Sequence, residues 1–357
     1  MSPRGPVRIL SLTYAEEHWT NAQQVNAREI AKRLDPSRFE MTLLSGADGP
    51  APVLESPAVR VFRLPRRLRS AAILRRLLSD RQDIVFYPGS GIPETIYLAL
   101  PRRAPGRRAR VRVPVEGDVG QLDEVPYYVR RRVERVLRRA DAVVPITSFV
   151  AETLLARLGR TGPIVPVGVD LATFRPRDQA RRPGPMRVLS VGTVKAWKRA
   201  ELVRIAAVAL PEVQFTWIGG GEDLEAQRAA APANLHFIGP CDRVTLPEHY
   251  RSADVLLHPG RREGLPKVVL ESLASAVPVI AFSAWRPEFL REKGAGLVVS
   301  DEAGMLAALT LLRDDPARRA AMGVAGRDVA RAFDWGLVAA QWATIFDEQA
   351  DAAAAAR

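Results

Sequence analysis

The chain has 357 residues, of which 47% are hydrophobic, and a formal net charge of +12. This length is long for one hydrophobic core and predicts two domains of about 150 to 180 residues each. The single cysteine, Cys241, excludes an intrachain disulfide and favours a reducing, cytoplasmic setting. No stretch reaches the roughly 18 apolar residues of a membrane span, and the apolar run before Glu16 is too short for a signal peptide. A soluble protein is therefore expected.

The positive charge is concentrated in the first half of the chain. Residues 1–182 hold 32 Lys and Arg against 19 Asp and Glu, whereas the second half is balanced. Arginine clusters at 63–69, 101–112 and 130–139 favour attraction to an anionic membrane or an acidic substrate. An equally good interpretation is a set of arginine-rich, solvated helix faces. Nucleic acid is the weaker hypothesis, because no aromatic residues alternate with these arginines.

In chain order, short aliphatic runs alternate with stretches of helical periodicity, which predicts βαβ units around a parallel sheet. Strands are expected at 7–13, 39–45, 59–64, 83–88, 109–116 and 142–148, with helices at 22–34 and 127–140. After a stretch rich in proline and arginine at 174–185, the pattern restarts. Strands are then expected at 186–192, 213–221, 235–239, 254–259, 277–282 and 296–300.

These elements predict an α/β chain of two Rossmann-like, doubly wound domains that face each other across a cleft. The first domain is expected at 1–176, a linker at 177–185 and the second domain at 186–333. An amphipathic helix at 334–349 is expected to pack back on the first domain, followed by a tail at 350–357. Ligands of such sheets bind at the carboxyl ends of the strands.

One candidate site is the segment "EGLPKVVLE" at 263–271. Pro266 suits the first turn of a helix, which places Glu263 in the loop before it and Glu271 in its second turn. The amides of residues 264–267 then form an anion-binding helix start. A second glycine loop, with Gly219 and Gly220, follows a predicted strand. It is not GxGxxG and lacks the acidic residue about 20 positions later, which argues against a dehydrogenase.

These motifs resemble those of the retaining, nucleotide-sugar-dependent glycosyltransferases of family 4, which have the GT-B fold. The segment 263–271 is similar to the family's E-x7-E signature, and "VGTVKAWKR" (191–199) to its "VGRLxxxKG" loop. Further matches, in family order, are "ADAVVPITS", "IVPVGVD", "GGGED", "FIG", "YRSADVLLHP" and "PVIAF" followed by Glu288. The resemblance covers residues 140–350 well and the first 140 residues loosely.

The resemblance implies a role for each matching residue. Glu271 would bind the ribose hydroxyls of the donor, Glu263 the hydroxyls of the transferred sugar, and Lys198 the leaving diphosphate. We count Glu263 and Lys198 as catalytic candidates. The other implied donor contacts are Gly219, Gly220, Gly264, Leu265, Pro266, Lys267 and Glu288. The family mechanism has a diphosphate oxygen deprotonate the acceptor on the same face of the sugar. No metal ion or cofactor beyond the nucleotide-sugar co-substrate is expected, and no pair of histidines has metal-ligand spacing.

The chain departs from the family pattern at several positions. Thr193 stands where the family has an arginine, so Lys195 or Arg199 is a candidate replacement on the diphosphate. Glu116 and Asp118 stand where the family often has a histidine, and we count both as catalytic candidates beside the alternative of turn chemistry around Gly117. The N-terminal loop lacks the frequent Gly-Gly. We take Tyr14 and His18 in this region as acceptor-binding candidates.

The predicted function is transfer of a hexose-type sugar from UDP- or GDP-sugar to an acceptor hydroxyl with retention of configuration. The acceptor would be a lipid, a saccharide or a small molecule, in cell-surface glycan, glycolipid or specialised-metabolite biosynthesis. We expect a cytoplasmic enzyme with peripheral contact to an anionic membrane through its basic first domain. The alternatives are a nucleotide-sugar epimerase or pseudo-glycosyltransferase on the same fold, and a catalytically inactive lipid- or nucleic-acid-binding protein.

Overall fold

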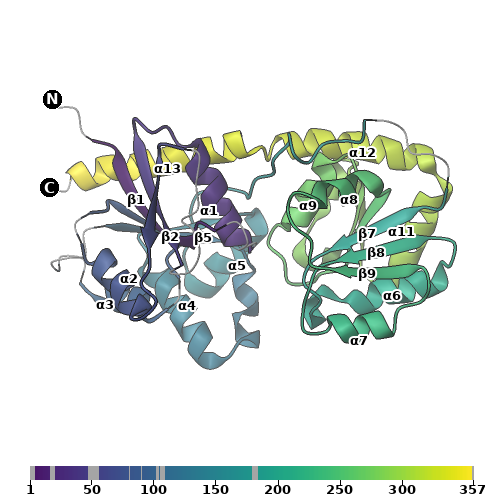
Figure 1. The fold of residues 1–357 in the computed structure, drawn as a ribbon, viewed down its shortest axis with the longest axis horizontal. Coiled ribbons are helices and arrows are strands. Elements are labelled where there is room, and N and C mark those ends of the chain that lie inside the picture. The colour runs from purple at the N-terminus through teal and green to yellow at the C-terminus, as the bar shows by residue number, and fades with distance from the viewer. Residues whose placement is uncertain are drawn as a thin grey trace. The chain divides into compact units, whose positions relative to one another are not determined.

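The computed structural model describes residues 5–16, 21–46, 56–79, 81–89, 91–101, 104, 109–178 and 184–355. The chain forms two compact units, one comprising residues 1–167 with 335–357 and the other residues 168–334. Each unit is built on a six-stranded parallel sheet flanked by helices (Figure 1). The α/β, doubly wound architecture predicted from the alternating pattern is confirmed.

The first unit contains six of these strands. They are β1 (Val7–Tyr14), β2 (Phe39–Ser45), β3 (Val59–Arg63), β4 (Ile84–Phe86), β5 (Arg110–Val115) and β6 (Ala142–Pro145). Its helices are α1 (Ala22–Arg33), α2 (Arg69–Leu77), α3 (Ile92–Ala99), α4 (Tyr127–Arg139), α5 (Ser148–Leu158) and the short 3-10 helix η1 (Val119–Glu124). Local capping sets several of the helix starts. Asn21 accepts from the Gln24 amide before α1, and Thr147 accepts from the Val150 amide before α5.

The strands of the first unit lie in the order β3-β2-β1-β4-β5-β6. This is the Rossmann order, in which the chain winds outward in both directions from the neighbours β1 and β4. The point where the winding reverses is therefore at the carboxyl ends of these two strands. A ligand of the first unit is expected at this edge.

The C-terminal helix α13 (Trp335–Ala355) completes the core of the first unit. Its buried apolar face consists of Trp335, Val338, Trp342, Ile345 and Phe346. The rings of Trp342 and Phe346 lie 4.8 and 5.3 Å from the ring of Phe86 in β4. The helix thus covers β-strands that precede it by some 250 residues in the chain, with the edge-to-face ring geometry favoured by aromatic pairs.

The second unit repeats this plan. Its strands are β7 (Arg187–Val191), β8 (Gln214–Ile218), β9 (Leu235–Gly239), β10 (Val255–His258), β11 (Val279–Phe282) and β12 (Gly296–Val299). Its helices are α6 (Ala200–Ala209), α7 (Leu224–Ala229), α8 (Leu246–Ser252), α9 (Lys267–Ala274), α10 (Glu288–Glu292), α11 (Glu302–Asp314) and α12 (Pro316–Arg331), with 3-10 turns η2 (Ala196–Lys198) and η3 (Ser283–Trp285). The strand order β12-β11-β10-β7-β8-β9 places the reversal between β7 and β10.

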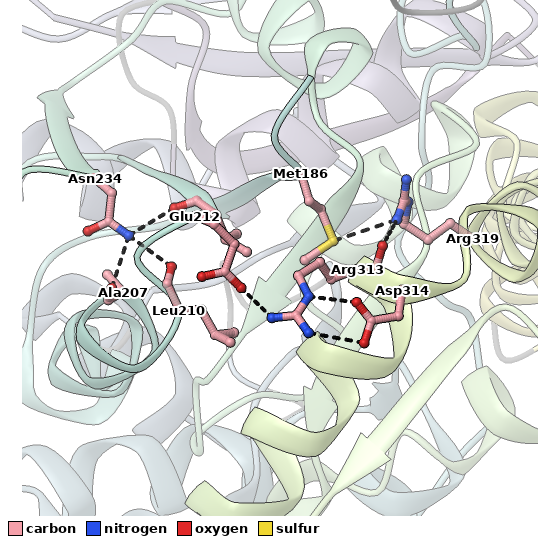
Figure 2. Close-up of polar contacts among 9 residues, drawn as sticks. Met186, Ala207, Leu210, Glu212, Asn234, Arg313, Asp314 and Arg319 are labelled. Atoms are coloured by element: carbon pink, nitrogen blue, oxygen red, sulfur yellow. Dashed lines mark hydrogen bonds and ion pairs between the residues drawn. The ribbon is translucent and has the colours of Figure 1, made fainter. Parts of the chain in front are cut away.

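Polar side chains hold the amino-terminal edge of this second sheet (Figure 2). The buried Asn234 amide, just before β9, donates to the carbonyls of Ala207, Leu210 and Val213 at 2.9, 3.1 and 2.9 Å. Arg313 at the end of α11 pairs with Glu212, the residue two positions before β8. The loops of this edge are thus fixed by structural contacts, and the opposite, carboxyl-terminal edge carries the candidate site residues.

The boundary between the two units differs from the domain boundary predicted from the sequence and lies between Val167 and Gly168. Residues 168–176, predicted to end the first domain, belong to the second unit. The Val169 amide donates to the Phe333 carbonyl at 2.8 Å, and Phe174 packs edge-on against Tyr250 with ring centroids 5.6 Å apart. The chain therefore passes between the units at 167/168 and at 334/335. Of the linker predicted at 177–185, residues 179–183 lie outside the described part of the chain.

Candidate functional site

Two predicted site residues of the second unit, Lys198 and Glu263, contact each other where the strand order of its sheet reverses. Lys198 follows β7, and Glu263 follows β10, the neighbouring strand. Lys198 Nζ donates to Glu263 Oε1 at 2.5 Å, although 65 residues separate the two in sequence. Both side chains are mostly buried, at 18% and 12% exposure. A charge-assisted contact of this kind, formed at the ligand-binding edge of the sheet, joins the two loops that the family resemblance singles out.

His258, the last residue of β10, is the third member of this cluster. Its side chain is buried, and its Nε2 lies 3.4 Å from Glu263 Oε1 without a hydrogen-bond partner. His258 was not among the predicted site residues, and its Nε2 faces the Glu263 carboxylate. The ring of Trp285 stands edge-on to His258, with centroids 6.0 Å apart.

The charge states of this cluster follow from its surroundings. Burial lowers the pKa of His258, so the imidazole is neutral at neutral pH. Burial acts in the opposite direction on Glu263 and would raise its pKa, but the contacts with His258 and Lys198 outweigh burial and lower the pKa to about 2. With the imidazole neutral, the positive charge beside Glu263 comes from Lys198. Glu263 is therefore a carboxylate and a hydrogen-bond acceptor across the physiological range.

Glycines let the surrounding backbones come close together. Gly219 has φ +142°, and a Cβ on it would meet the Gly192 carbonyl oxygen at 2.0 Å. Gly221 has φ +156° and would meet the Val194 carbonyl oxygen at 2.3 Å, while the Val194 amide donates to the Gly220 carbonyl. The loops after β7 and β8 thus lie against each other, and only glycine fits at their contact.

The loop after β7 contains Lys195 and Arg199, the two candidates to replace the family arginine that is Thr193 in this chain. Thr193 lies in this loop, and Lys195 Nζ lies 5.1 Å from the ring centroid of Trp197, a cation–π contact. Arg199 differs from Lys195. It has φ +53°, its guanidinium lies 4.0 Å over the ring of Phe282, and its Nε and Nη2 are buried without hydrogen-bond partners. Burial lowers the pKa of Arg199, yet a guanidinium stays charged.

Helix α9 supplies the remaining predicted donor residues. It begins at Lys267 with Pro266 as its N-cap, so Pro266 lies one position before the helical turn in which the sequence analysis placed it. No side chain caps the start of the helix. Gly264 and Leu265 lie in the preceding loop, and Leu265 is buried.

Glu271, in the second turn of α9, is buried and polar. Its Oε2 accepts from the hydroxyl of Tyr250 at 3.0 Å, and its Oε1 lies 3.7 Å from Nη2 of Arg243. Burial raises the pKa of Tyr250 well above its usual value, and the negative charge of Glu271 raises it further. Tyr250 was not among the predicted site residues, although it lies within the matching segment "YRSADVLLHP". Glu288 is the first residue of α10 and is half-buried.

In the first unit, Glu116 follows β5 and lies beside two side chains that the sequence analysis did not predict. Its Oε1 accepts from Asn26 Nδ2 at 2.6 Å and from the hydroxyl of Tyr87. Tyr87 follows β4 with φ +46°, a conformation that costs a bulky residue energy. Burial raises the pKa of Tyr87 well above its usual value, and the negative charge of Glu116 raises it further. Such an outlier is undetectable from residue types, because tyrosine rarely adopts it.

A cavity of about 280 Å³ opens beside this cluster. Its lining includes Tyr87, Glu116 and Asp118, together with apolar residues of β5 and α4. Asp118 also caps η1, because its Oδ1 accepts from the Gly120 amide at 2.8 Å. Of the two predicted acceptor residues, Tyr14 is the last residue of β1, and His18 lies outside the described residues.

Comparisons with known proteins identify the family. The model described as "Glycosyl transferases group 1" matches residues 185–315, and "Glycosyl transferase 4-like domain" matches residues 21–170. The chain is 30% identical to a GDP-mannose-dependent α-(1-6)-phosphatidylinositol monomannoside mannosyltransferase of Mycolicibacterium smegmatis, over 95% of this chain and 88% of that protein. The chain belongs to the group 1, family 4 glycosyltransferases.

Other relatives match over a smaller share of their length. A D-inositol 3-phosphate glycosyltransferase of Kineococcus radiotolerans is 32% identical over 58% of this chain, which spans 57% of that protein. Among solved structures, sucrose-phosphate synthase of Thermosynechococcus elongatus superposes with a TM-score of 0.80 at 20% identity, covering 98% of this chain and 100% of that one. Anabaena HepE with UDP-glucose has a TM-score of 0.75 at 16% identity, covering 96% and 99%. This glycosyltransferase therefore has the GT-B fold.

Proposed function

We propose that this glycosyltransferase moves a hexose-type sugar from UDP- or GDP-sugar to an acceptor hydroxyl with retention of configuration. The observation that carries the proposal is the contact of Lys198 with Glu263 at the reversal point between β7 and β10. It places a cation and an acceptor-only carboxylate side by side beside an uncapped helix start. A sugar diphosphate has the complementary groups, namely hydroxyl donors next to an anion.

Each part of the donor has a partner in this arrangement. Lys198, Arg199 and the start of α9 stabilise the diphosphate charge, while Glu263 accepts hydrogen bonds from hydroxyls of the sugar. Glu271, held by Tyr250, accepts from the ribose hydroxyls. Because Glu263 and Lys198 contact each other in the structure, the donor exchanges this contact for contacts of its own with both residues.

The reaction breaks the bond between the anomeric carbon and the diphosphate oxygen. The acceptor oxygen bonds to the same face of the anomeric carbon, and its proton passes to an oxygen of the departing diphosphate. The transition state carries positive charge on the sugar and growing negative charge on the leaving group. Lys198 and Arg199 stabilise this growing negative charge, and the ionised Glu263 holds the sugar.

For the acceptor, we propose the cavity beside Glu116 in the first unit. Its charged lining residues are Glu116 and Asp118, and the lining contains no Lys or Arg. A phosphate would be repelled there, whereas a neutral hydroxyl-bearing group would donate to Glu116 while apolar atoms contact β5 and α4. The part of the acceptor that enters the cavity is therefore neutral, whether it belongs to a lipid, a saccharide or a small molecule.

The setting follows from the charge of the first unit. We propose peripheral contact with the anionic cytoplasmic face of a membrane and a role in making cell-surface glycans, glycolipids or glycosides of specialised metabolites. In the described part of the chain, no helix is both long and apolar enough to cross a membrane. The contact would therefore be made by surface arginines.

Calorimetric titration with UDP and with GDP tests the donor proposal. One of the two is expected to bind the wild type, and Glu271→Ala to weaken that binding by about tenfold, the loss of a hydrogen bond to a charged group. Equal binding by the variant, or no binding of either nucleotide to the wild type, would contradict the proposal. A screen of donors for nucleoside diphosphate release then compares neutral with phosphorylated acceptors. Donor turnover that needs no acceptor would instead favour an epimerase.

A further inference from the structure

Two side chains approach the same oxygen of Glu263, and the proposed reaction uses only one of them. Lys198 Nζ lies 2.5 Å from Glu263 Oε1, and His258 Nε2 lies 3.4 Å from the same atom. Lys198 has a diphosphate to bind, whereas the buried His258 has no part in the transfer described above. Its Nε2 has no hydrogen-bond partner among the described residues. A buried ring nitrogen in this state calls for an explanation, because it gains stability as soon as it finds a partner.

The two contacts of Glu263 differ in where their partners come from. Lys198 belongs to η2, after β7, so its contact joins two separate loops. His258 ends β10 and belongs to the same strand and loop as Glu263. A Cβ on Gly260, between them, would lie 2.6 Å from Glu263 Oε1 and 3.0 Å from His258 Nε2, so the loop backbone passes close to both atoms. A donor can therefore draw Lys198 away from Glu263 while His258 stays beside it.

Donor binding changes the charge balance around Glu263. In the structure, the Lys198 ammonium compensates this mostly buried carboxylate. In the proposed donor complex the ammonium binds the diphosphate, and Glu263 accepts hydrogen bonds from sugar hydroxyls, which are neutral. The carboxylate would then lack a counter-charge, and a buried unpaired charge is strongly unfavourable. A proton on His258 restores the balance at the same oxygen.

The charges that act on His258 are those of Glu263 and Lys198. Burial lowers the pKa of the imidazole, the Glu263 carboxylate raises it, and the Lys198 ammonium lowers it. The uncharged Ala281 of β11 lies beside His258 in the sheet, and the uncharged ring of Trp285 in η3 stands edge-on to it. Departure of the ammonium thus removes one of the two influences that keep the imidazole neutral and leaves the carboxylate that favours its protonation.

Helix α9 also packs against β10 and contains two titratable residues, Lys267 and Glu271. Lys267 is the first residue of the helix. The Glu271 carboxylate lies beside Tyr250 and Arg243, at 3.0 and 3.7 Å. In the proposed function it accepts from the ribose hydroxyls, so its charge is directed at another part of the donor.

We propose that donor binding protonates His258 and that the imidazolium replaces Lys198 as the partner of Glu263. The imidazole gains one proton from solvent, so that Nε2 carries hydrogen and donates to Oε1, and Glu263 stays a carboxylate. His258 is thus a positioning residue, which holds Glu263 toward the sugar while Lys198 binds the diphosphate. The inference rests on the proposed donor site and adds a proton-coupled step to it.

Calorimetric titration in buffers of different ionisation enthalpy measures the protons bound together with the donor. UDP-glucose and GDP-mannose are the probes, because the diphosphate of a sugar nucleotide, unlike that of UDP or GDP, has no proton to exchange near neutral pH. We expect a probe to bind with uptake of about 0.3 to 1 proton at pH 6.5, and about threefold or more tightly at pH 6 than at pH 8. Affinity rises toward low pH because the pKa of the imidazole is higher in the complex than in the free protein.

Two matched variants assign the proton. A glutamine at position 258 donates a hydrogen bond but binds no proton, so His258→Gln is expected to lose both the uptake and the pH dependence. His236→Gln is the control and is expected to keep both, because His236 is exposed on β9, which β7 and β8 separate from β10. Near-ultraviolet circular dichroism checks that both variants keep the wild-type fold.

The outcomes separate this inference from the donor proposal. Binding of a probe without proton uptake would overturn the inference and leave the donor site standing. Uptake that persists in His258→Gln would assign the proton to another group and overturn it too, whereas binding of neither probe would overturn the donor proposal and this inference with it. Nuclear magnetic resonance of the four histidine rings in the wild type needs no variant: one ring is expected to become an imidazolium when the probe is added, and four unchanged rings would contradict the proposal.

Discussion

Arg199 combines a left-handed backbone conformation with a buried guanidinium whose Nε and Nη2 lack hydrogen-bond partners. A left-handed backbone and a buried guanidinium with two unpaired nitrogens are both unfavourable without a ligand. Lys195, the other candidate for the missing cation, rests against Trp197. The structure therefore separates two residues that were equivalent in the sequence, and Arg199 is the better candidate for the diphosphate.

Replacing Arg199 by Met keeps most of the side-chain volume and removes the charge. We expect Arg199→Met to weaken nucleoside diphosphate binding by about tenfold or more, while binding of the nucleoside changes little, because a charge-assisted hydrogen bond to phosphate is lost. Lys195→Met is the matched control, with an expected change below about threefold. Calorimetric titration measures both ligands. A larger effect of Lys195→Met would assign the phosphate contact to Lys195.

The lowered pKa of Glu263 predicts a dependence of stability on pH. The pKa falls from 4.5 in the unfolded chain to about 2 in the folded protein, so the unfolded state binds more protons between these values. The stability contributed by the ionised carboxylate is complete above pH 4.5 and is lost as the pH falls toward 2. We expect Glu263→Gln to lack this contribution and its pH slope. Urea unfolding at pH 6 and at pH 3 measures it, and parallel losses in both proteins would contradict the expectation.

At the scale of elements, glycines hold the loops after β7 and β8 of the second unit against each other, beside the proposed donor site. Gly219 combines a positive φ with a carbonyl oxygen 2.0 Å from where a Cβ would lie. We expect Gly219→Ala to destabilise the second unit by about 2 kcal/mol or more and to weaken nucleotide binding, because the loop after β7 must move. Gly220→Ala is the matched control for stability, since its Cβ would meet the side chain of Pro240 at 3.0 Å and no backbone. Thermal unfolding and UDP titration compare the two variants.

The elements were largely predictable, and the first-unit site was predictable only in part, through Glu116 and Asp118. Aliphatic runs with helical stretches between them predict the twelve strands found among the described residues, because buried parallel strands consist of such runs. Glu263 and Lys198 were found through motifs with fixed spacing. Tyr87 and Asn26 carry no such spacing, and they meet Glu116 only through the order of β1, β4 and β5. His258 was not predicted either, because residue types along β10 do not reveal that its ring faces Glu263.

The domain boundary was missed because composition and packing disagree there. Proline and arginine between 174 and 185 indicate an exposed linker, and the described residues of this stretch, 174–178 and 184–185, form no helix or strand. Arg327, however, donates to the carbonyls of Leu171, Phe174 and Ala274, which ties the preceding segment to the second unit. This side chain, the Val169–Phe333 hydrogen bond and the Phe174–Tyr250 ring contact join the segment to the second unit. All three partners lie far along the chain, and no local pattern contains that information.

At the scale of the whole molecule, the second unit is continuous in sequence. One of its core clusters runs from Met186 to Leu312, and both of its chain crossings lie beside the Val169–Phe333 hydrogen bond. We therefore expect residues 168–334 alone to fold cooperatively and to bind the same nucleoside diphosphate as the full chain. Urea unfolding and calorimetric titration of this fragment test the expectation. A fragment without a cooperative transition would show that the first unit is needed for its stability.

The first unit is discontinuous, and this matters during synthesis. Its core includes Trp335, Trp342 and Phe346, which are synthesised after the whole second unit. Until then, the β-strands of the first unit lack their apolar cover while the second unit emerges and folds. The nascent chain therefore exposes Phe39 and Phe86 for the time needed to translate some 250 codons, and it is in this interval that a chaperone would bind.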